Sequence, residues 1–166
     1  MSKEINEMCD NLLKKIDDKY NSLKVEDEIK WDFVIALNNE ESIDKIKCKL
    51  NIEMPEDLIN LIENYNGGYP NKSSCNIKDY GTTDFKCLLS YNEEDDENIY
   101  DVIDYFIDKY KGGVLPFACD SGDGYYCISD KGIIYVNNDK SYFVSENINK
   151  LLLSLYKEDT NSKMYL

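Results

Sequence analysis

The chain has 166 residues, enough for one compact domain with one hydrophobic core, and its formal net charge is −14. This charge argues against nucleic acid or an anionic membrane surface as a partner, because both need a basic footprint, and it favours a basic partner. Histidine and arginine are absent from the sequence, which excludes imidazole acid–base catalysis, Ser-His and Cys-His nucleophile pairs and arginine phosphate clamps.

The cysteines form no CxxC pair and lie mostly among apolar neighbours. The six are Cys9, Cys48, Cys75, Cys87, Cys119 and Cys127. The segment MSKEINEMCD contains no signal-peptide hydrophobic region, so we expect reduced, mostly buried thiols in a cytoplasmic protein, in preference to disulfides or a metal site. Because no run approaches 18 apolar residues, we expect no membrane span, and no motif points to a cofactor.

Residues 3–23 carry apolar side chains at helical spacing, with charged residues between them. The pattern predicts an amphipathic helix whose apolar stripe packs on its own domain, and the alternative is a docking surface for a partner. The charged segment 24–30 then leads to WDFVIAL at 31–37, which we interpret as a short extended segment or edge strand.

Two further helices are predicted before residue 70. Asn38, with Glu41 three residues later, fits a helix cap and predicts a helix over about 39–50. Pro55 suits the first position of the next helix, whose buried face follows from apolar spacing. That face comprises Leu58, Leu61, Ile62 and Tyr65. Asn66, Gly67 and Gly68 end this helix, with Gly67 as the left-handed residue after its last turn.

The next stretch, 69–82, is a loop by composition, and Thr83 to Tyr91 is a strand candidate. Five consecutive acids then precede a predicted helix that ends near residue 110, and their charge suits its N-terminus. They are Glu93, Glu94, Asp95, Asp96 and Glu97. Two interpretations remain open for this run: a solvated loop, or a recognition surface for a basic partner.

Residues 114–136, VLPFACDSGDGYYCISDKGIIYV, contain two acidic, glycine-punctuated turns between apolar runs. They predict two consecutive hairpins, that is three antiparallel strands of a central sheet. A last strand at 141–144 and a closing helix at 147–156 follow. The element order predicts an α+β fold with a mostly antiparallel sheet covered by helices. We divide the chain into an N-terminal helix and connection packed on the core (1–30), the domain (31–157) and a frayed tail (158–166).

Three segments together resemble the SUKH superfamily, which includes the fungal cell-wall assembly regulator. They are MPEDLINLIENYNGGYP at 54–70, VLPFACDSGDGYYCIS at 114–129 and VSENINKLLLSLY at 144–156. The matching motif positions are Asn66, Gly67, Gly68, Leu115, Pro116, Phe117, Ala118, Asp120 and Gly122. Most of them look architectural, and the resemblance implies the α+β fold predicted above.

The resemblance implies a binding module, since many bacterial relatives are immunity proteins that neutralise a toxin by binding it. With the charge, it leads us to expect a cytoplasmic protein that occludes the active site of a basic, nuclease-type toxin. Candidate partner-binding residues are Tyr69, Tyr80, Glu93, Glu94, Asp95, Asp96, Glu97, Asp120, Asp123 and Tyr125.

Two other classes of function remain open. The fungal relatives suggest a regulatory or scaffolding module, for which the N-terminal helix would be a docking or dimerisation element. An enzyme or cation site would use Asp120 and Asp123 as paired carboxylates, although Asp in a glycine-rich turn ordinarily serves the turn itself. The sequence does not determine the oligomeric state.

Overall fold

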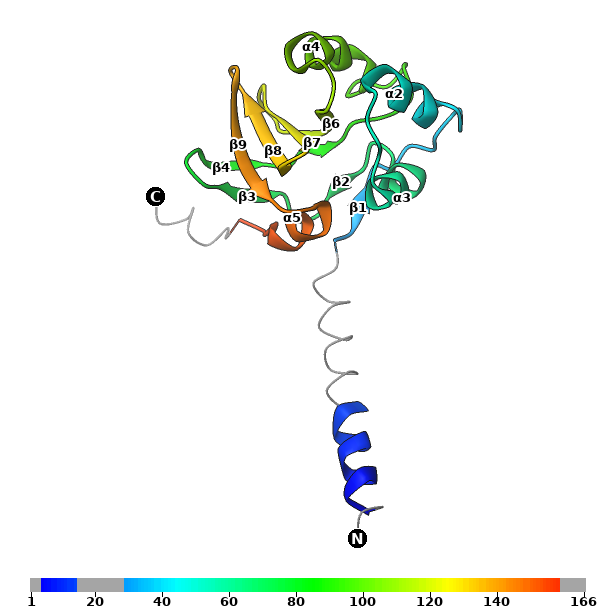
Figure 1. The fold of residues 1–166 in the computed structure, drawn as a ribbon, viewed down its shortest axis with the longest axis vertical. Coiled ribbons are helices and arrows are strands. Elements are labelled where there is room, and N and C mark those ends of the chain that lie inside the picture. The colour runs from blue at the N-terminus through cyan, green and yellow to red at the C-terminus, as the bar shows by residue number, and fades with distance from the viewer. Residues whose placement is uncertain (1–3, 15–28, 159–166) are drawn as a thin grey trace.

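A computed structural model describes residues 4–14 and 29–158, and its centre is one antiparallel sheet (Figure 1). Five strands lie in chain order, each hydrogen-bonded to the next. They are β5 (Cys87–Leu88), β6 (Leu115–Cys119), β7 (Tyr125–Ser129), β8 (Gly132–Asn137) and β9 (Lys140–Ser145). The predicted hairpins of residues 114–136 are thus confirmed as β6, β7 and β8, and the last predicted strand is β9.

The central strands β6, β7 and β8 are buried on both faces of the sheet, to which their successive side chains point in turn, whereas the edge strand β9 is largely exposed. In β8, Ile133 and Tyr135 enter the larger apolar cluster, whereas Ile134 and Val136 enter a smaller one with Cys127 of β7. This double burial explains why residues 114–136 are an almost continuous apolar sequence rather than an alternating one.

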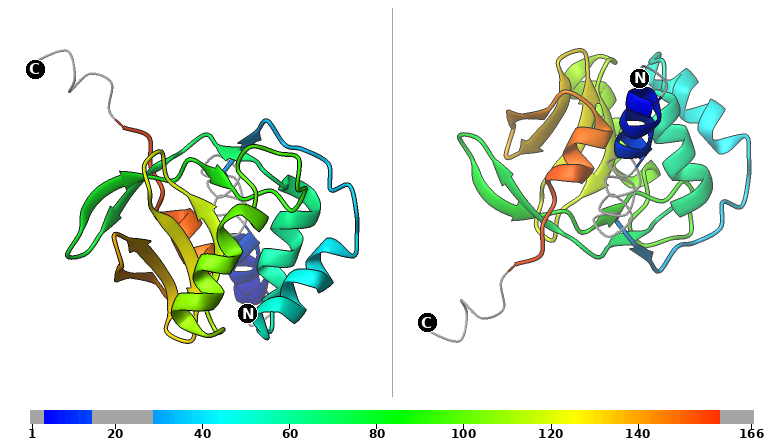
Figure 2. Two further views of the ribbon diagram at one scale, coloured as in Figure 1. Left: turned by 90° about the horizontal axis from the view of Figure 1, so that it is seen from above. Right: turned by 90° about the horizontal axis from the view of Figure 1, so that it is seen from below.

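Helices cover the two faces of the sheet (Figures 1 and 2). They are α2 (Ser42–Leu50), α3 (Glu56–Tyr65), α4 (Tyr100–Tyr110) and α5 (Ile148–Ser154). The larger cluster contains side chains of α2, α3 and α5, such as Ile46, Leu58 and Leu151. On the opposite face, α4 inserts Phe106 against Cys127 and Ile134. The α+β fold predicted from the sequence is therefore confirmed.

The predicted loop at 69–82 is wrong in part, because two short pairings form there. Strand β2 (Tyr69–Pro70) pairs with β1 (Trp31–Asp32), and β3 (Ser74–Ile77) forms a hairpin with β4 (Gly81–Asp84). The signal for β3 is brief, since only Cys75 and Ile77 alternate inward and Asn76 points out. The polar residues that flank this short alternation hide it in the sequence. The predicted strand 83–91 is divided: residues 83–84 end β4, and Cys87–Leu88 form β5.

Details of two predicted helices also differ. Asn38 is not the cap of α2, because Glu41 occupies the N-cap position and makes no side-chain capping bond, while the Asn39 side chain accepts from the Glu41 amide at 2.9 Å. Tyr65 of α3 is 40% exposed rather than buried, and its ring stacks on Trp31 with centroids 5.8 Å apart. Trp31 belongs to strand β1, so Tyr65 packs on this short strand at the surface rather than in the core.

Residues 4–14 form a helix, as the apolar spacing predicts. Its apolar side chains are exposed in the described structure. The exposed side chains are Ile5, Met8, Leu12 and Leu13. The rest of the predicted helix, 15–23, and the tail from 159 onward lie outside the described residues. Within the described chain, no helix has the length and apolar character needed to cross a membrane.

One buried hydroxyl provides a test of the core. Tyr91 is 1% exposed, and its hydroxyl is the one buried side-chain polar atom in the described part of the chain without a hydrogen-bond partner. Because leaving such a group unpaired costs free energy, we expect Tyr91→Phe to raise the free energy of unfolding by about 1 kcal/mol. Denaturant unfolding followed by circular dichroism measures it.

The matched control is Tyr126→Phe. The Tyr126 hydroxyl donates to the carbonyl oxygen of Asp84 at 2.9 Å, so its removal should destabilise the protein by about 1 kcal/mol. Equal destabilisation by both substitutions would contradict the assignment of Tyr91 as unpaired.

Candidate functional site

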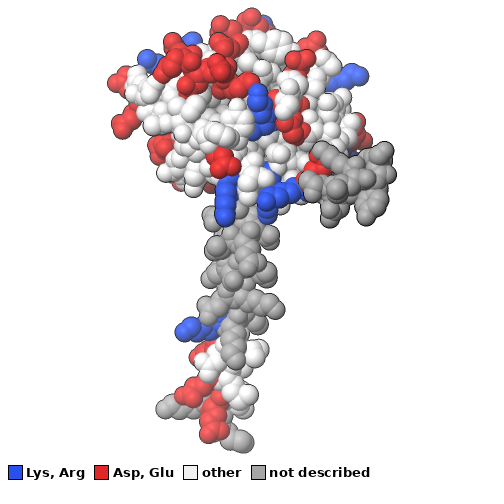
Figure 3. Space-filling model, turned by 180° about the vertical axis from the view of Figure 1, so that it is seen from behind, with Lys and Arg blue, Asp and Glu red and all other residues white. Residues whose placement is uncertain are grey.

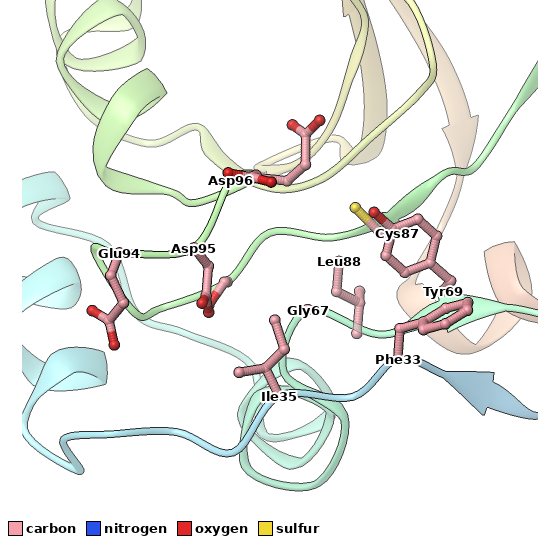
Figure 4. Close-up of a pocket in the computed structure, with 11 residues that line it drawn as sticks. Phe33, Ile35, Gly67, Tyr69, Cys87, Leu88, Glu94, Asp95 and Asp96 are labelled. Atoms are coloured by element: carbon pink, nitrogen blue, oxygen red, sulfur yellow. The ribbon is translucent and has the colours of Figure 1, made fainter.

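A hollow of about 550 Å³ lies between the segment that follows β1, the end of α3, strand β5 and the acidic loop 93–97 (Figure 4). Its wall combines apolar side chains, among them Phe33, Ile35 and Leu88, with carboxylates of the acidic loop. Figure 4 shows the rings of Phe33 and Tyr69 at one end and Glu94 and Asp95 at the other. We call this hollow the acidic pocket.

The acidic loop is held by buried polar side chains rather than by apolar packing. The Ser90 hydroxyl donates to Asp95 Oδ2 at 2.5 Å, and Asn92 Nδ2 donates to the same oxygen at 3.2 Å. Asn98 Nδ2 donates to the Asp95 carbonyl oxygen at 2.8 Å. Asp95 is thus engaged with its own loop, which favours a defined shape for the run of acids.

Asn66, which follows α3, connects this loop to the opposite wall. Its side chain is almost fully buried, and its Nδ2 donates to the Ile35 carbonyl oxygen at 3.2 Å and to Ser90 Oγ at 3.0 Å. Its Oδ1 accepts from the Tyr91 amide at 2.9 Å. One amide side chain therefore joins three segments that are distant in sequence.

Of the two glycines after Asn66, Gly67 belongs to the floor of the pocket and Gly68 follows it. Gly67 has a φ of +70°, a left-handed conformation that glycine adopts without strain, and it lines the acidic pocket. A Cβ on Gly68 would lie 2.9 Å from the Tyr65 carbonyl oxygen. The sequence Asn-Gly-Gly thus ends the helix, as predicted, and also allows the close approach of backbone that shapes the pocket.

Two aromatic rings mark one end of the acidic pocket. Phe33 is 79% exposed, and its ring lies edge-on to Tyr69 with centroids 5.6 Å apart. The Tyr69 side chain is half-buried beside Cys87 (Figure 4). Burial, and then the Cys87 thiol, raise the pKa of Tyr69, so this phenol stays neutral near neutral pH. The exposed face of Phe33 is free for a partner.

The acids of the loop differ in what they already contact. Glu97 pairs with Lys86 at 2.8 Å, and this hydrogen bond raises the pKa of the lysine. Glu94 accepts from the Asn38 amide side chain. Glu93 and Asp96 are exposed, and within the described chain neither contacts a hydrogen-bond or ion-pair partner. Figure 3 shows acidic side chains gathered over the upper part of the domain, with lysines fewer and more scattered.

Of the roles considered for Asp120, the structure favours service of the turn over contact with a partner. Its carboxylate is 5% exposed and accepts from the Gly122 and Gly124 amides, each at 2.9 Å. Its other oxygen accepts from the hydroxyls of Thr83 and Tyr135. With these four donors inside the protein, Asp120 holds the β6–β7 turn and is not available to a partner. Asp123 is exposed and does not face the same site, so the two carboxylates do not form a pair.

The remaining predicted contacts lie outside the acidic pocket. Asp123 and Tyr125 line a second hollow of about 310 Å³ with Tyr105 and Asp139. Tyr80 packs on Tyr135 with ring centroids 4.8 Å apart. Of the predicted partner-binding residues, the structure thus brings Tyr69 together with the acids from Glu94 to Glu97.

Sequence reasoning missed Phe33, Ile35, Ser90 and Asn92 as parts of the site. The run WDFVIAL was interpreted as a short extended segment or edge strand, and nothing in it distinguishes Phe33, which is exposed, from Trp31, which is partly buried. Ser90 and Asn92 flank Tyr91 just before the acids, and these two polar residues are the one sequence signal that could have assigned them to the site. Their pairing with Asn66, Ala36 and Asn38 depends on tertiary contact.

The described cysteines are free thiols, four of them buried. The Sγ atoms of Cys87 and Cys119 lie 3.7 Å apart on paired strands, and their hydrogen bond, followed by burial, raises the pKa of Cys119. Within residues 4–14 and 29–158, no group of three cysteine or carboxylate side chains is placed to hold a metal ion.

Comparison with known proteins identifies the family. A family model described as the SMI1 / KNR4 family (SUKH-1) matches residues 38–154, well over half of the chain, so the chain belongs to this family. The resemblance found in the sequence motifs is confirmed. No curated protein and no solved structure matched the chain.

The bridging role of Asn66 can be tested by Asn66→Ala. This change leaves the Tyr91 amide and the Ile35 carbonyl without their partner inside the protein, so we expect the free energy of unfolding to fall by roughly 2 to 4 kcal/mol. Urea titration measures the loss.

Asn64→Ala is the matched control, because Asn64 lies on the same helix and its Nδ2 donates only to the exposed Asn60 carbonyl, at 2.8 Å. We expect a change of less than about 0.5 kcal/mol there. Similar losses for both variants would contradict a bridge at Asn66.

Proposed function

We propose that this SUKH-1 family member is an immunity protein that binds a cognate toxin and blocks its active site. The partner is a basic, nuclease-type toxin domain, and the complex forms in the cytoplasm of a bacterium. The protein acts by binding rather than by catalysis. The family supports this class of function, because it includes immunity proteins as well as regulatory members.

The observation that carries the proposal is the acidic pocket. Exposed apolar side chains, Phe33, Val34 and Ile35, lie beside a run of carboxylates whose shape is set by buried hydrogen bonds. An apolar centre with a charged rim is the composition of a protein-binding surface. A preformed loop also lowers the ordering cost of binding.

Charge supports a basic partner. With a net charge of −14, the protein attracts a cationic domain from a distance and speeds encounter. A nuclease must itself carry a positive cleft to hold nucleic acid, so an acidic surface that enters this cleft competes with the substrate. Occlusion of the active site follows from this complementarity.

A second candidate is a regulatory or scaffolding module. The apolar stripe on residues 4–14 favours it, since Ile5, Met8 and Leu12 are each more than half exposed. A version of the chain that begins at residue 29 separates the two: loss of self-association with retained toxin binding assigns the helix to assembly, whereas loss of toxin binding assigns it to the toxin interface.

The direct test is co-expression with a basic, nuclease-type toxin domain. Cell survival and co-purification, with a complex that weakens as salt rises from 50 mM to 500 mM, would support the proposal. Survival without a complex, or neither survival nor a complex, would contradict it.

Charge reversal locates the interface. Glu93→Lys with Asp96→Lys alters two exposed carboxylates that have no described partner, so the fold should be retained. We expect the association rate with the toxin, measured by stopped flow, to fall about tenfold and its salt dependence to weaken.

The matched control is Glu53→Lys with Asp130→Lys. Both residues are exposed and lie outside the acidic pocket, and the net charge changes by the same amount. An equal loss of rate in both double variants would assign the effect to net charge alone and refute a local interface at the acidic loop.

A further inference from the structure

The structure of the acidic pocket restricts which side chain of a partner it can accept. Its floor is apolar, formed by Ile35, Gly67 and Leu88, and its rim carries Glu94, Asp95 and Asp96. A wholly apolar side chain would leave these carboxylates partly desolvated without a counter-charge, which is unfavourable. A compact, strongly hydrated cation would cover the apolar floor poorly. The pocket suits a long side chain with an apolar stem and a cationic end.

We propose that the acidic pocket binds an arginine of the partner together with an apolar side chain adjacent to it. This inference rests on the proposed function and names the chemistry that its site recognises. The arginine stem lies along Ile35 and Leu88, and the guanidinium group faces the rim. The adjacent apolar side chain packs on the Phe33 ring at the other end.

The charges at the rim favour a guanidinium group. Asp96 is exposed and has no described partner, and Asp95 is held in place by Ser90 and Asn92, with its Oδ1 atom not engaged in any described hydrogen bond. Lys86 already neutralises Glu97, so the cation is directed toward Asp95 and Asp96. Guanidinium is planar, weakly hydrated and able to donate to two carboxylates at once, whereas lysine presents a single hydrated charge.

The aromatic end provides the second element of recognition. Phe33 is 79% exposed although it is a large apolar residue, and its position is fixed by the edge-on contact with Tyr69. Neighbouring backbone is anchored by the hydrogen bond from the Ile35 amide to the Asn66 carbonyl oxygen, at 2.9 Å. The ring is thus an apolar contact at the end of the acidic pocket opposite Glu94 and Asp95 (Figure 4).

The test uses three short peptides and the full chain labelled with ¹⁵N. Acetyl-Leu-Arg-amide is the probe, acetyl-Leu-citrulline-amide has the same shape without the charge, and acetyl-Gly-Arg-amide lacks the apolar neighbour. We expect the probe to shift the amide signals of Gly67, Tyr69 and Leu88. Loss of the charged hydrogen bonds should weaken the citrulline peptide about tenfold.

Two variants assign the ends of the acidic pocket. Asp96→Asn should abolish the preference for arginine over citrulline, and Phe33→Ala should abolish the preference for Leu-Arg over Gly-Arg. Asp130→Asn and Phe143→Ala, which alter an exposed acid and an exposed aromatic residue elsewhere, should change neither preference.

Equal binding of the citrulline and arginine peptides would overturn the inference, as would shifts at Glu40, Glu41 and Asp44 around the start of α2 instead of the pocket. This result is independent of the co-expression test. If the protein rescues cells but shows no selectivity for arginine, the immunity function is supported and the arginine site is contradicted. If the protein selects arginine but does not rescue cells, the arginine site is supported and the toxin-binding function is contradicted.

Discussion

The side-chain amide of Asn66 is the contact on which the candidate site depends. It lies at the end of α3, where Gly67 turns the chain in a left-handed conformation, and it bonds Ile35 on one wall and Ser90 and Tyr91 on the other. Because these atoms are buried, water cannot replace the missing partner without rearrangement. The apolar wall and the acidic loop therefore keep a fixed spacing.

The five acids of residues 93–97 do not contribute equally to a surface charge. Asp95 stabilises the loop, Glu97 pairs with Lys86 and Glu94 contacts Asn38, while Glu93 and Asp96 have no partner among the residues that the structure describes. Like charges held close together repel, and the hydrogen bonds of Asp95 offset part of that cost. The arrangement gives a strong local potential on a loop with little freedom to reorganise.

The family match covers the acidic loop and Gly67 of the acidic pocket but not its Phe33 and Ile35 wall. The motif residues mostly serve the fold: Asn66 bridges segments, Asp120 holds the β6–β7 turn and Phe117 is buried in the core. Phe33 and Ile35, by contrast, lie before residue 38, where the family match begins. One wall of the acidic pocket therefore lies outside the matched region, although the Ile35 backbone is tied to Asn66 within it.

The sequence by itself determined the elements whose signals are local. The strands of residues 114–136, the helix begun by Pro55 and the Asn-Gly-Gly end of that helix follow from apolar spacing and from the backbone preferences of proline and glycine. The β3–β4 hairpin was not predicted because only two apolar residues alternate with polar ones in β3. Only the tertiary structure decided that Asp120 is buried, that Phe33 is exposed and that Asn66 joins the acidic loop to the apolar wall. Burial and hydrogen-bond partners depend on which distant segments meet, and spacing along one segment carries no information about that.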